Sequence, residues 1–198
     1  MNQNNRFLVL SIVFTFVSSF VAHAEETEDG FVALFDGKSL DGWEIMNGGK
    51  FVVEEGVIKL NGGRGWLRSE SEYADFVLKA EVRWMKPKQD SGFFLRATKE
   101  GSNWPSRRYE VQCENSSRVC RIFGAPHERD IELCEKLLKD VGQWQSYEII
   151  CKGTRCEVKF NGKVVATSNG FKESKGHIGL QGEGGLLEFR GLRIKVIE

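Results

Sequence analysis

The stretch FVLKAEVRW, residues Phe76–Trp84, alternates apolar and charged side chains with a period of two. Its even-numbered residues are all apolar, whereas Lys79, Glu81 and Arg83 lie between them. Successive side chains of a β-strand point to opposite faces, so one face of this strand is apolar and the other is largely charged. The pattern predicts a half-buried strand of an antiparallel sheet.

Turn signals divide much of the remaining chain into further strands. The stretch FVVEEGVIKL predicts a hairpin across Glu54-Glu55-Gly56, and CEVKFNGKVVATS predicts another across Asn161-Gly162. The closing run, residues 177–198, supplies two or three more strands. Helical spacing is confined to RDIELCEKLLKD, residues 129–140, which could form one short helix or a long loop. We therefore expect an all-β fold, a two-sheet antiparallel sandwich with at most one short helix.

The first residues have the pattern of a secretory signal peptide. Arg6 precedes an apolar run from Phe7 to Val21, and Ala22-His23-Ala24 supplies the small residues that a signal peptidase recognises. A membrane-spanning segment is the alternative, but it requires roughly 20 apolar residues. We expect residues 1–24 to be removed, leaving residues 25–198 as a single β-sandwich domain of a secreted or periplasmic protein.

The charge balance limits the classes of partner. The chain has 28 Lys and Arg residues against 28 Asp and Glu residues. Nucleic-acid binding requires a basic face that neutralises phosphates, so we expect no nucleic-acid partner. No segment after the leader is long and apolar enough to span a bilayer, so we expect no membrane span in the mature protein.

The five cysteines all follow the predicted cleavage site, in a compartment where disulfides persist. Cys151 and Cys156 flank one short turn, and Cys113 and Cys120 flank another, so either pair could form a bridge if the geometry allows it. The odd number leaves at least one thiol without a partner in the chain, and Cys134 is the expected one. Their spacing does not match a zinc site.

A series of short motifs runs through almost the whole mature chain, and their order is more specific than any one of them. The motifs include ALFDGKSLDGWE, YADFVLKAEVRW, DSGFFLRA, YEVQ, VGQWQSYEIICKG and GHIGLQGEGGLLEFRGLRI. In this order and spacing, from about Phe31 to Ile197, the chain resembles the bacterial 3-keto-disaccharide hydrolase family. The resemblance implies a concanavalin A-like jelly roll and cleavage of 3-keto-glycosides by elimination, sometimes followed by hydration.

The strand pair around YEVQ supplies the first candidate site residues. Alternation places Glu110 and Gln112 on the face opposite Tyr109 and Val111, and the same rule places Phe94 and Arg96 together. If these strands are neighbours, Arg96 can approach Glu110 and the polar stripe can line a sugar-binding groove. The alternative is a cross-strand ion pair on a solvent-exposed face, which stabilises a sheet only slightly.

Elimination next to a ketone requires a base at C2 and a cation or hydrogen-bond donor for the enolate oxygen. We predict Glu110 as the catalytic base or acid, with His127 as the second catalytic candidate because it lies in a loop with two acidic residues. The predicted sugar-binding residues are Arg96, Gln112, Gln181, Phe94, Trp104 and Asp90. A turn cap is the alternative for Asp90, and solvent exposure is the alternative for Gln181.

The sequence predicts no specific cofactor. A divalent metal bound by His127 and a neighbouring carboxylate is an open alternative. The leading hypothesis is thus an exported enzyme that acts on a keto-sugar substrate. A lectin-like carbohydrate-binding module is the rival, because the same sandwich can bind glycans without catalysis. A structural protein of the cell envelope is a third interpretation, and it predicts no pocket. The sequence does not determine the linkage of the substrate or the oligomeric state.

Overall fold

The structure is a computed structural model that describes residues 26–27 and 30–197. The expected signal peptide, residues 1–24, lies outside the described residues. The strands are β1 (Glu26–Thr27), β2 (Phe31–Ala33), β3 (Trp43–Glu54), β4 (Val57–Tyr73), β5 (Phe76–Trp84), β6 (Gly92–Ala97), β7 (Tyr109–Gln112), β8 (Ile122–Phe123), β9 (Glu128–Arg129), β10 (Gln145–Lys152), β11 (Arg155–Phe160), β12 (Lys163–Ser168), β13 (Gly176–Glu183) and β14 (Leu186–Val196). One helix, α1 (Ile131–Leu137), begins after the N-cap Asp130, whose side chain accepts a hydrogen bond from the backbone N–H of Leu133.

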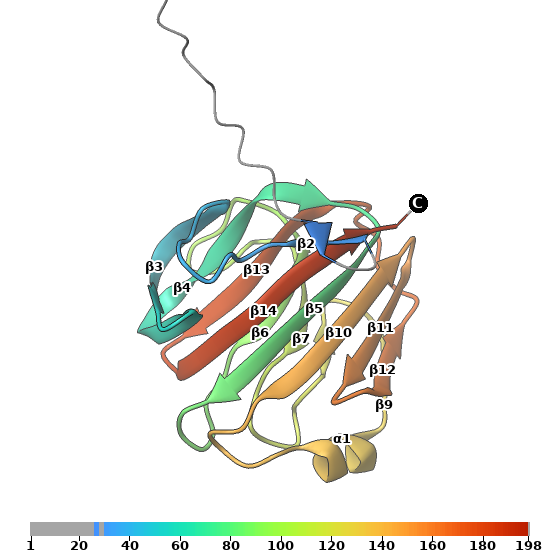
Figure 1. Ribbon diagram of the computed structural model, residues 1–198. Coiled ribbons are helices and arrows are strands. Elements are labelled where there is room, and N and C mark those ends of the chain that lie inside the picture. Colours follow the sequence, from blue (N-terminus) through green and yellow to red (C-terminus); the bar gives the residue numbers. More distant parts are fainter. Residues whose placement is uncertain (1–25, 28–29, 198) are drawn as a thin grey trace, which may run out of the picture.

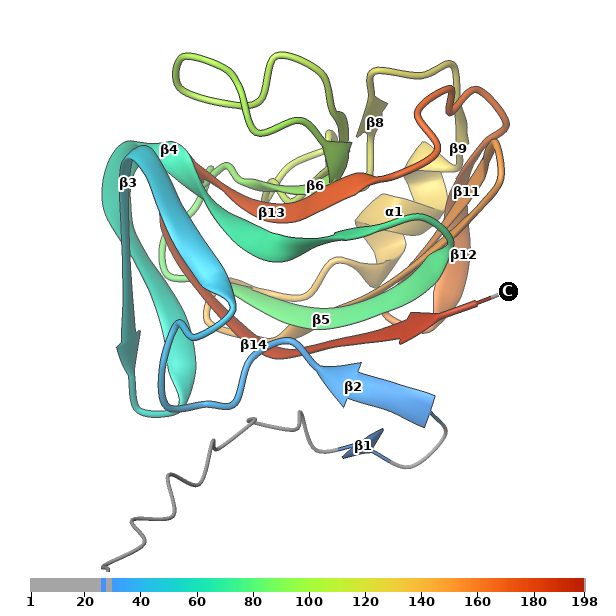
Figure 2. The ribbon, with the colours of Figure 1, turned by 90° about the horizontal axis from the view of Figure 1, so that it is seen from above.

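The strands pair into one antiparallel sheet that curls into two facing layers (Figures 1 and 2). The front layer of Figure 1 contains β14, β5, β10, β11 and β12, and the second layer contains β8, β7, β6 and β13. Strand β4 belongs to both layers, because its first residues pair with β14 and its later residues, from Arg64, pair with β13. The predicted all-β sandwich is confirmed.

Two glycines allow β4 to change layers. Gly62 and Gly63 have φ angles of +87° and +82°, a conformation that other residues rarely adopt. A Cβ atom on Gly63 would lie 2.1 Å from the carbonyl oxygen of Gly48 on the neighbouring strand. The point at which β4 passes from one layer to the other therefore requires glycine for two reasons: its backbone freedom, and the lack of a Cβ atom at the close approach to β3.

Hairpin turns occur where the sequence predicts them. Glu55 and Gly56 both have positive φ between β3 and β4, as do Asn161 and Gly162 between β11 and β12. Positive φ at both central residues gives the turn that matches the twist of the adjoining strands. The helical spacing in residues 129–140 corresponds to α1, which is a single short helix.

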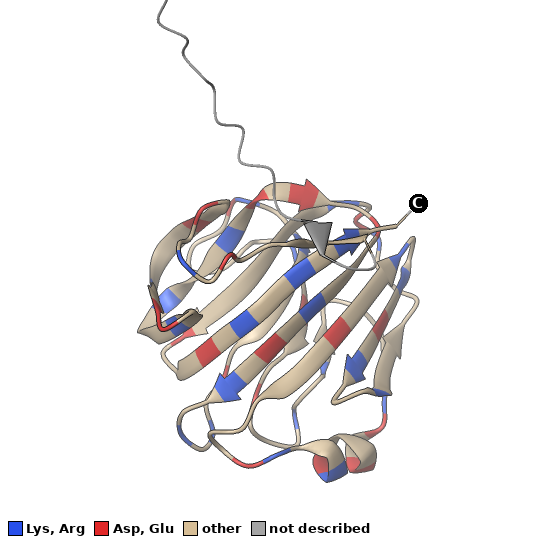
Figure 3. Cartoon of the chain, viewed as in Figure 1, with Lys and Arg blue, Asp and Glu red and all other residues tan. Residues whose placement is uncertain are grey.

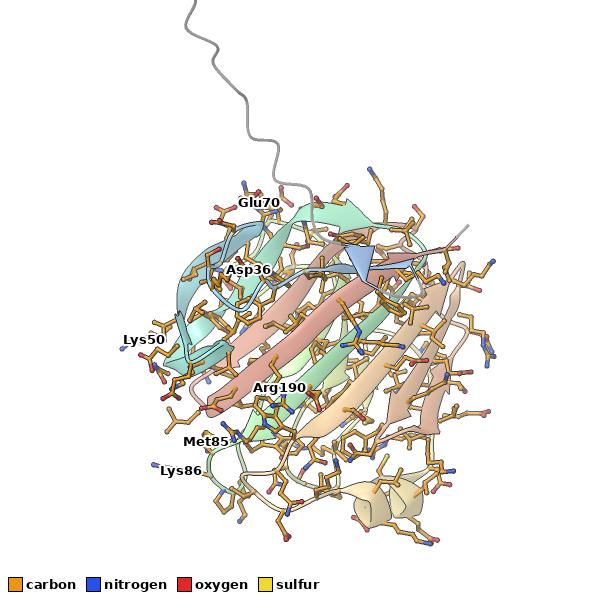
Figure 4. All side chains as sticks on the ribbon, in the orientation of Figure 1. Asp36, Lys50, Glu70, Met85, Lys86 and Arg190 are labelled. Carbon is orange, nitrogen blue, oxygen red and sulfur yellow. The ribbon has the colours of Figure 1, made fainter. Side chains whose placement is uncertain are left out.

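The core lies between the two layers and contains aromatic side chains from both. Phe93 of β6 contacts Tyr147 of β10 and Phe189 of β14 edge-on, with ring centroids 5.3 and 6.3 Å apart. Strand β5 alternates between buried and half-buried residues, as its sequence predicts. Its charged side chains lie on the outer face of the front layer, where Figure 3 shows alternating charges and Figure 4 shows Arg190 on the neighbouring strand.

The second layer differs because it is covered on both faces. Every residue of β6 and β7 is buried. A small second cluster, formed by Trp66, Phe94 and Ala97 with Met46 and Trp104 packed against it, lies on the face opposite the main core. The segment between β6 and β7 supplies Trp104 and stands outside this layer in Figure 2. Polar side chains on this face are consequently shielded from water.

Candidate active site

The candidate site is a cavity of about 220 Å³ on the outer face of the second layer. Strand β7 contributes Glu110 and Gln112, β13 contributes Gln181, and the segment before β6 contributes Asp90. The remaining lining residues are Trp104, Arg108, Arg118, Phe123 and Glu183. The cavity therefore brings together four of the residues predicted from strand alternation or motif position, together with Trp104 from the adjoining loop.

Glu110 is a buried carboxyl group at the centre of this arrangement. Its residue is 4% exposed, and its side chain packs on Gly92, where a Cβ atom would lie 2.7 Å from Glu110 Oε1. Burial raises the pKa of Glu110 to about 7, although the Arg108 guanidinium, whose Nε lies 3.3 Å from Glu110 Oε2, opposes the shift. A carboxyl with this pKa can both accept and return a proton near neutral pH.

Asp90 is a second carboxyl group with perturbed ionisation. Burial and the negative charges of Glu114 and Glu183 raise the pKa of Asp90 to about 6. Gln112 donates a hydrogen bond from Nε2 to Asp90, and the Arg118 guanidinium lies 3.7 Å from the carboxylate. Two carboxyl groups with different pKa values in one cavity are an arrangement that can divide acid and base roles.

Two amide oxygens add hydrogen-bond acceptors to the cavity. The Oε1 atoms of Gln112 and Gln181 are buried and have no hydrogen-bond partner among the described residues. Both side chains line the cavity. Buried polar atoms are normally hydrogen-bonded, so unpaired acceptors in a cavity are suited to a ligand that carries hydroxyl groups.

Aromatic and guanidinium groups form one wall of the cavity. Trp104 donates a hydrogen bond from Nε1 to the carbonyl of Gly182, at 3.3 Å, which links the loop to β13. The Arg108 guanidinium lies over the rings of Phe94 and Trp104, at 5.1 and 6.0 Å from their centroids. Phe94 is completely buried, so it supports Arg108 and does not itself face the cavity.

The family comparison matches almost the entire described chain. A family model described as the 3-keto-alpha-glucoside-1,2-lyase-like domain matches residues 30–195. The chain belongs to this family. This membership places it among carbohydrate-active proteins, as the sequence motifs predicted.

Solved structures show the same fold at low sequence identity. A candidate glycosyl hydrolase from Parabacteroides distasonis has a TM-score of 0.68 at 20% identity, over 88% of this chain and 99% of that chain. A carbohydrate-binding module from Bacillus subtilis has a TM-score of 0.57 at 12% identity, over 78% and 95%. A β-glucanase from Bacillus licheniformis has a TM-score of 0.56 at 11% identity, over 85% and 97%. These similarities confirm the jelly-roll fold, and a comparison with curated proteins gives no match.

Arg96 lies away from the cavity of this lyase-like domain, contrary to the predicted stripe. Its φ of +48° interrupts the alternation of β6, where Phe94 pairs with Gly179 and Ala97 pairs with His177. Three residue steps on β6 therefore face two on β13, which is a β-bulge. The 1% exposed Arg96 instead donates hydrogen bonds to Asp75 and to the carbonyls of Ala74, Gly153 and Glu173, so its role here is structural.

His127 also lies outside the Glu110 cavity. It lines a separate cavity with residues that include Pro126, Thr167 and Ser168, and its Nδ1 lies 3.3 Å from the carbonyl oxygen of Ala125. The two catalytic candidates, Glu110 and His127, therefore line different cavities. Among the described residues, no group of three or more His, Cys, Asp or Glu side chains is arranged to hold a metal ion. No helix within the described ranges is long and apolar enough to cross a membrane.

The structure adds three charged residues to the site: Arg108, Arg118 and Glu183. Two of them follow the period-two rule, because Arg108 precedes Glu110 by two positions and Glu183 follows Gln181 by two. That signal was present in the sequence. Arg118 gives no such signal, since it reaches Asp90 from the turn that follows β7.

All five cysteines are buried free thiols, so neither predicted bridge is formed in the structure. Cys151 and Cys156 are direct cross-strand neighbours on β10 and β11. The thiol of Cys120 is hydrogen-bonded to that of Cys134 and not to Cys113, whose sulfur lies 3.7 Å from the carbonyl oxygen of Val111. The expected turn-spanning partner of Cys120 is therefore replaced by a residue of α1.

Proposed function

We propose that this protein is an exported enzyme that cleaves the glycosidic bond of 3-keto-glycosides, with Glu110 as the base. The observation that carries the proposal is the buried Glu110 carboxyl with a pKa of about 7, beside a guanidinium group in a cavity. Membership of the lyase-like family supports the substrate class. Export rests on the leader sequence, with residues 25–198 as the mature domain.

The proposed reaction begins at C2 of the oxidised sugar, where the neighbouring ketone makes the hydrogen acidic. The Glu110 carboxylate accepts the C2 proton, and the electron pair moves into an enolate whose oxygen is stabilised by the Arg108 guanidinium. The enolate then expels the C1 substituent, so a C1–C2 double bond forms as the glycosidic C–O bond breaks. Asp90 in its protonated form supplies a proton to the leaving oxygen.

Hydration of the resulting glycal uses the same groups in the reverse direction. Water adds at C1 with Asp90 as the base, and protonated Glu110 returns a proton to C2. In both steps the acceptor oxygens of Gln112 and Gln181 bind sugar hydroxyl groups, and Trp104 packs against a sugar face. The order of the two carboxyl pKa values, about 7 for Glu110 and about 6 for Asp90, favours the protonation state that hydration requires. Elimination proceeds from the less populated state, in which Asp90 holds the proton and Glu110 is ionised.

The decisive test is turnover of a 3-keto-disaccharide by wild type and by Glu110→Gln. The substitution keeps the shape of the side chain and removes the proton acceptor, so we expect kcat to fall by about 10²–10⁴ with little change in ligand affinity. His127→Gln is the comparison variant, because it alters a titratable side chain in a different cavity, and its turnover is expected to match wild type. Unchanged turnover by Glu110→Gln would remove this residue from the mechanism.

A lectin-like module is the second candidate, because a ligand could bind to the unpaired amide oxygens and Trp104 without any proton transfer. The two candidates differ in what the wild-type protein does to the ligand. A wild-type protein that binds the keto-sugar and releases no product over hours would favour the module.

A further inference from the structure

A second cavity, of about 270 Å³, adjoins the candidate active site. Arg108 and Phe123 line both cavities. The second one is completed by Ser106, Arg107, Gly124 and Glu173. Each cavity alone is smaller than the roughly 300 Å³ at which sites for drug-sized ligands begin, whereas the two together exceed it. The pair can therefore hold a ligand with one part in each cavity.

The charge of the two cavities differs. Asp90, Glu110 and Glu183 line the first cavity, whereas Glu173 is the single acidic residue among those lining the second. The Glu173 carboxylate already accepts a hydrogen bond from the Tyr109 hydroxyl, which lowers the pKa of Glu173. One hydrogen bond of the Glu173 carboxylate is therefore already made within the protein.

Two arginines beside the second cavity have no carboxylate within 4.0 Å among the described residues, and the charge of Arg107 acts on Glu173 only as a minor cause of its lowered pKa. Within the described ranges, neither Arg107 nor Arg121 forms an ion pair, and both are exposed. The Arg121 guanidinium lies 4.6 Å from the centroid of the Phe123 ring, which is half-buried and lines both cavities. On the front layer, by contrast, Arg83 pairs with Glu188 and Arg190 with Glu81 across neighbouring strands (Figure 3).

We propose that the second cavity receives the leaving-group half of the substrate, and that this half carries an anionic oxygen group recognised by Arg107 and Arg121. The guanidinium fork matches the oxygens of both carboxylate and phosphate, so these are the two sources of the negative charge. The inference rests on the proposed function, because that function defines which half of the substrate leaves.

Binding measured with unoxidised α-glucosides tests this inference separately from turnover, because these ligands lack the ketone that makes the C2 hydrogen acidic. The three ligands carry a 4-carboxyphenyl, a 4-phosphonooxyphenyl or, as the neutral reference, a 4-carbamoylphenyl leaving group. Calorimetry on the wild-type protein should give lower Kd values for one or both anionic ligands. An exposed ion pair is worth up to about fivefold in affinity, so two arginines should give a preference of about 5–20-fold.

Substitutions of single arginines test which residues cause the preference for anionic ligands over the neutral ligand. Arg107→Gln and Arg121→Gln should each reduce it by up to about fivefold, and the double variant should abolish it. Arg64→Gln is the matched control, because the Arg64 guanidinium lies 5.8 Å from the ring centroid of Trp104, which lines the first cavity and not the second. Raising the ionic strength from about 0.01 M to about 1 M should also remove the preference, since the screening length falls from about 30 Å to about 3 Å.

Equal Kd values for the three ligands, or a preference that the double variant retains, would overturn the inference. A preference lost equally in Arg64→Gln would do the same, because it would reflect the overall charge of the rim. If Glu110→Gln leaves turnover unchanged but the wild-type protein still prefers anionic ligands, the proposed reaction is overturned and the anion-binding cavity is not.

Discussion

Replacing Glu110 with Gln should make the protein more stable at alkaline pH but not at acidic pH. Burial raises the pKa of Glu110 from an ordinary value of 4.5 to about 7 in the folded protein. The unfolded chain therefore ionises Glu110 near pH 4.5, whereas the folded protein retains the proton until about pH 7. The free energy of unfolding of the wild type decreases across this interval and becomes level above it.

The magnitude follows from the difference between the two pKa values. Each pKa unit corresponds to about 1.36 kcal/mol, so ionisation of Glu110 lowers the stability of the wild type by about 3 kcal/mol above pH 7. Gln carries no charge and avoids this loss. For a domain of this length, about 3 kcal/mol corresponds to an increase in Tm of about 6–12 °C at pH 8.5. Below pH 4.5 both proteins have an uncharged side chain at this position and should unfold alike.

Urea denaturation at pH 4 and pH 8.5, with circular dichroism as the probe, measures both free energies. Glu100→Gln is the control, because Glu100 is an exposed residue in the loop between β6 and β7 and makes no ion pair among the described residues. This control should change stability by no more than about 0.5 kcal/mol at either pH. A Glu110→Gln variant that gains no stability at pH 8.5 would show that Glu110 ionises as an ordinary surface carboxyl, and the reasoning about its catalytic role would fail with it.

Three further outcomes are expected. Arg96→Met should lower the free energy of unfolding, measured in urea, by about 3–5 kcal/mol, because it leaves Asp75 and three carbonyl groups without their cationic donor. The kcat of the folded fraction should stay near wild type, and a large loss of kcat with unchanged stability would contradict this prediction. Gly92→Ala should reduce kcat by about 10²-fold, because the new Cβ atom would lie 2.7 Å from Glu110 Oε1 and displace the carboxyl group. The variant should still unfold cooperatively, and a wild-type kcat would refute the contact. After exposure to oxidised glutathione, peptide mapping should find Cys151–Cys156 and Cys120–Cys134 disulfides and a free Cys113; a Cys113–Cys120 peptide would disprove this pairing.

Strand alternation alone predicted much of the candidate site. A period of two is a property of the extended backbone, so the separation of Glu110 and Gln112 from Tyr109 and Val111 could be deduced without knowing the neighbouring strands. The same rule, applied to the position two residues before Glu110, would have selected Arg108. The turn at Asn161-Gly162 was predictable for a similar reason, because positive φ is a local preference of these residues.

Arg96 shows where this local reasoning ends. Its predicted direction was wrong because a β-bulge lies between Phe94 and Ala97, and the bulge exists only through the register with β13, about 80 residues further along the chain. The hydrogen-bond acceptors of Arg96 come from three separate segments, which contain Ala74, Gly153 and Glu173. Nothing in the stretch SGFFLRA distinguishes an inward arginine from an outward one.

The sequence by itself determined the strands, their turns, the apolar face of each strand and the family. It could not determine whether Glu110 faces water or a cavity, because that depends on Trp104 and Arg108 folding over the second layer. The tertiary structure alone decided which cation lies beside Glu110 and how far its carboxyl is removed from water. Alternation is set by bonds between adjacent residues, whereas desolvation and charge pairing depend on distances between groups that only the folded chain brings together.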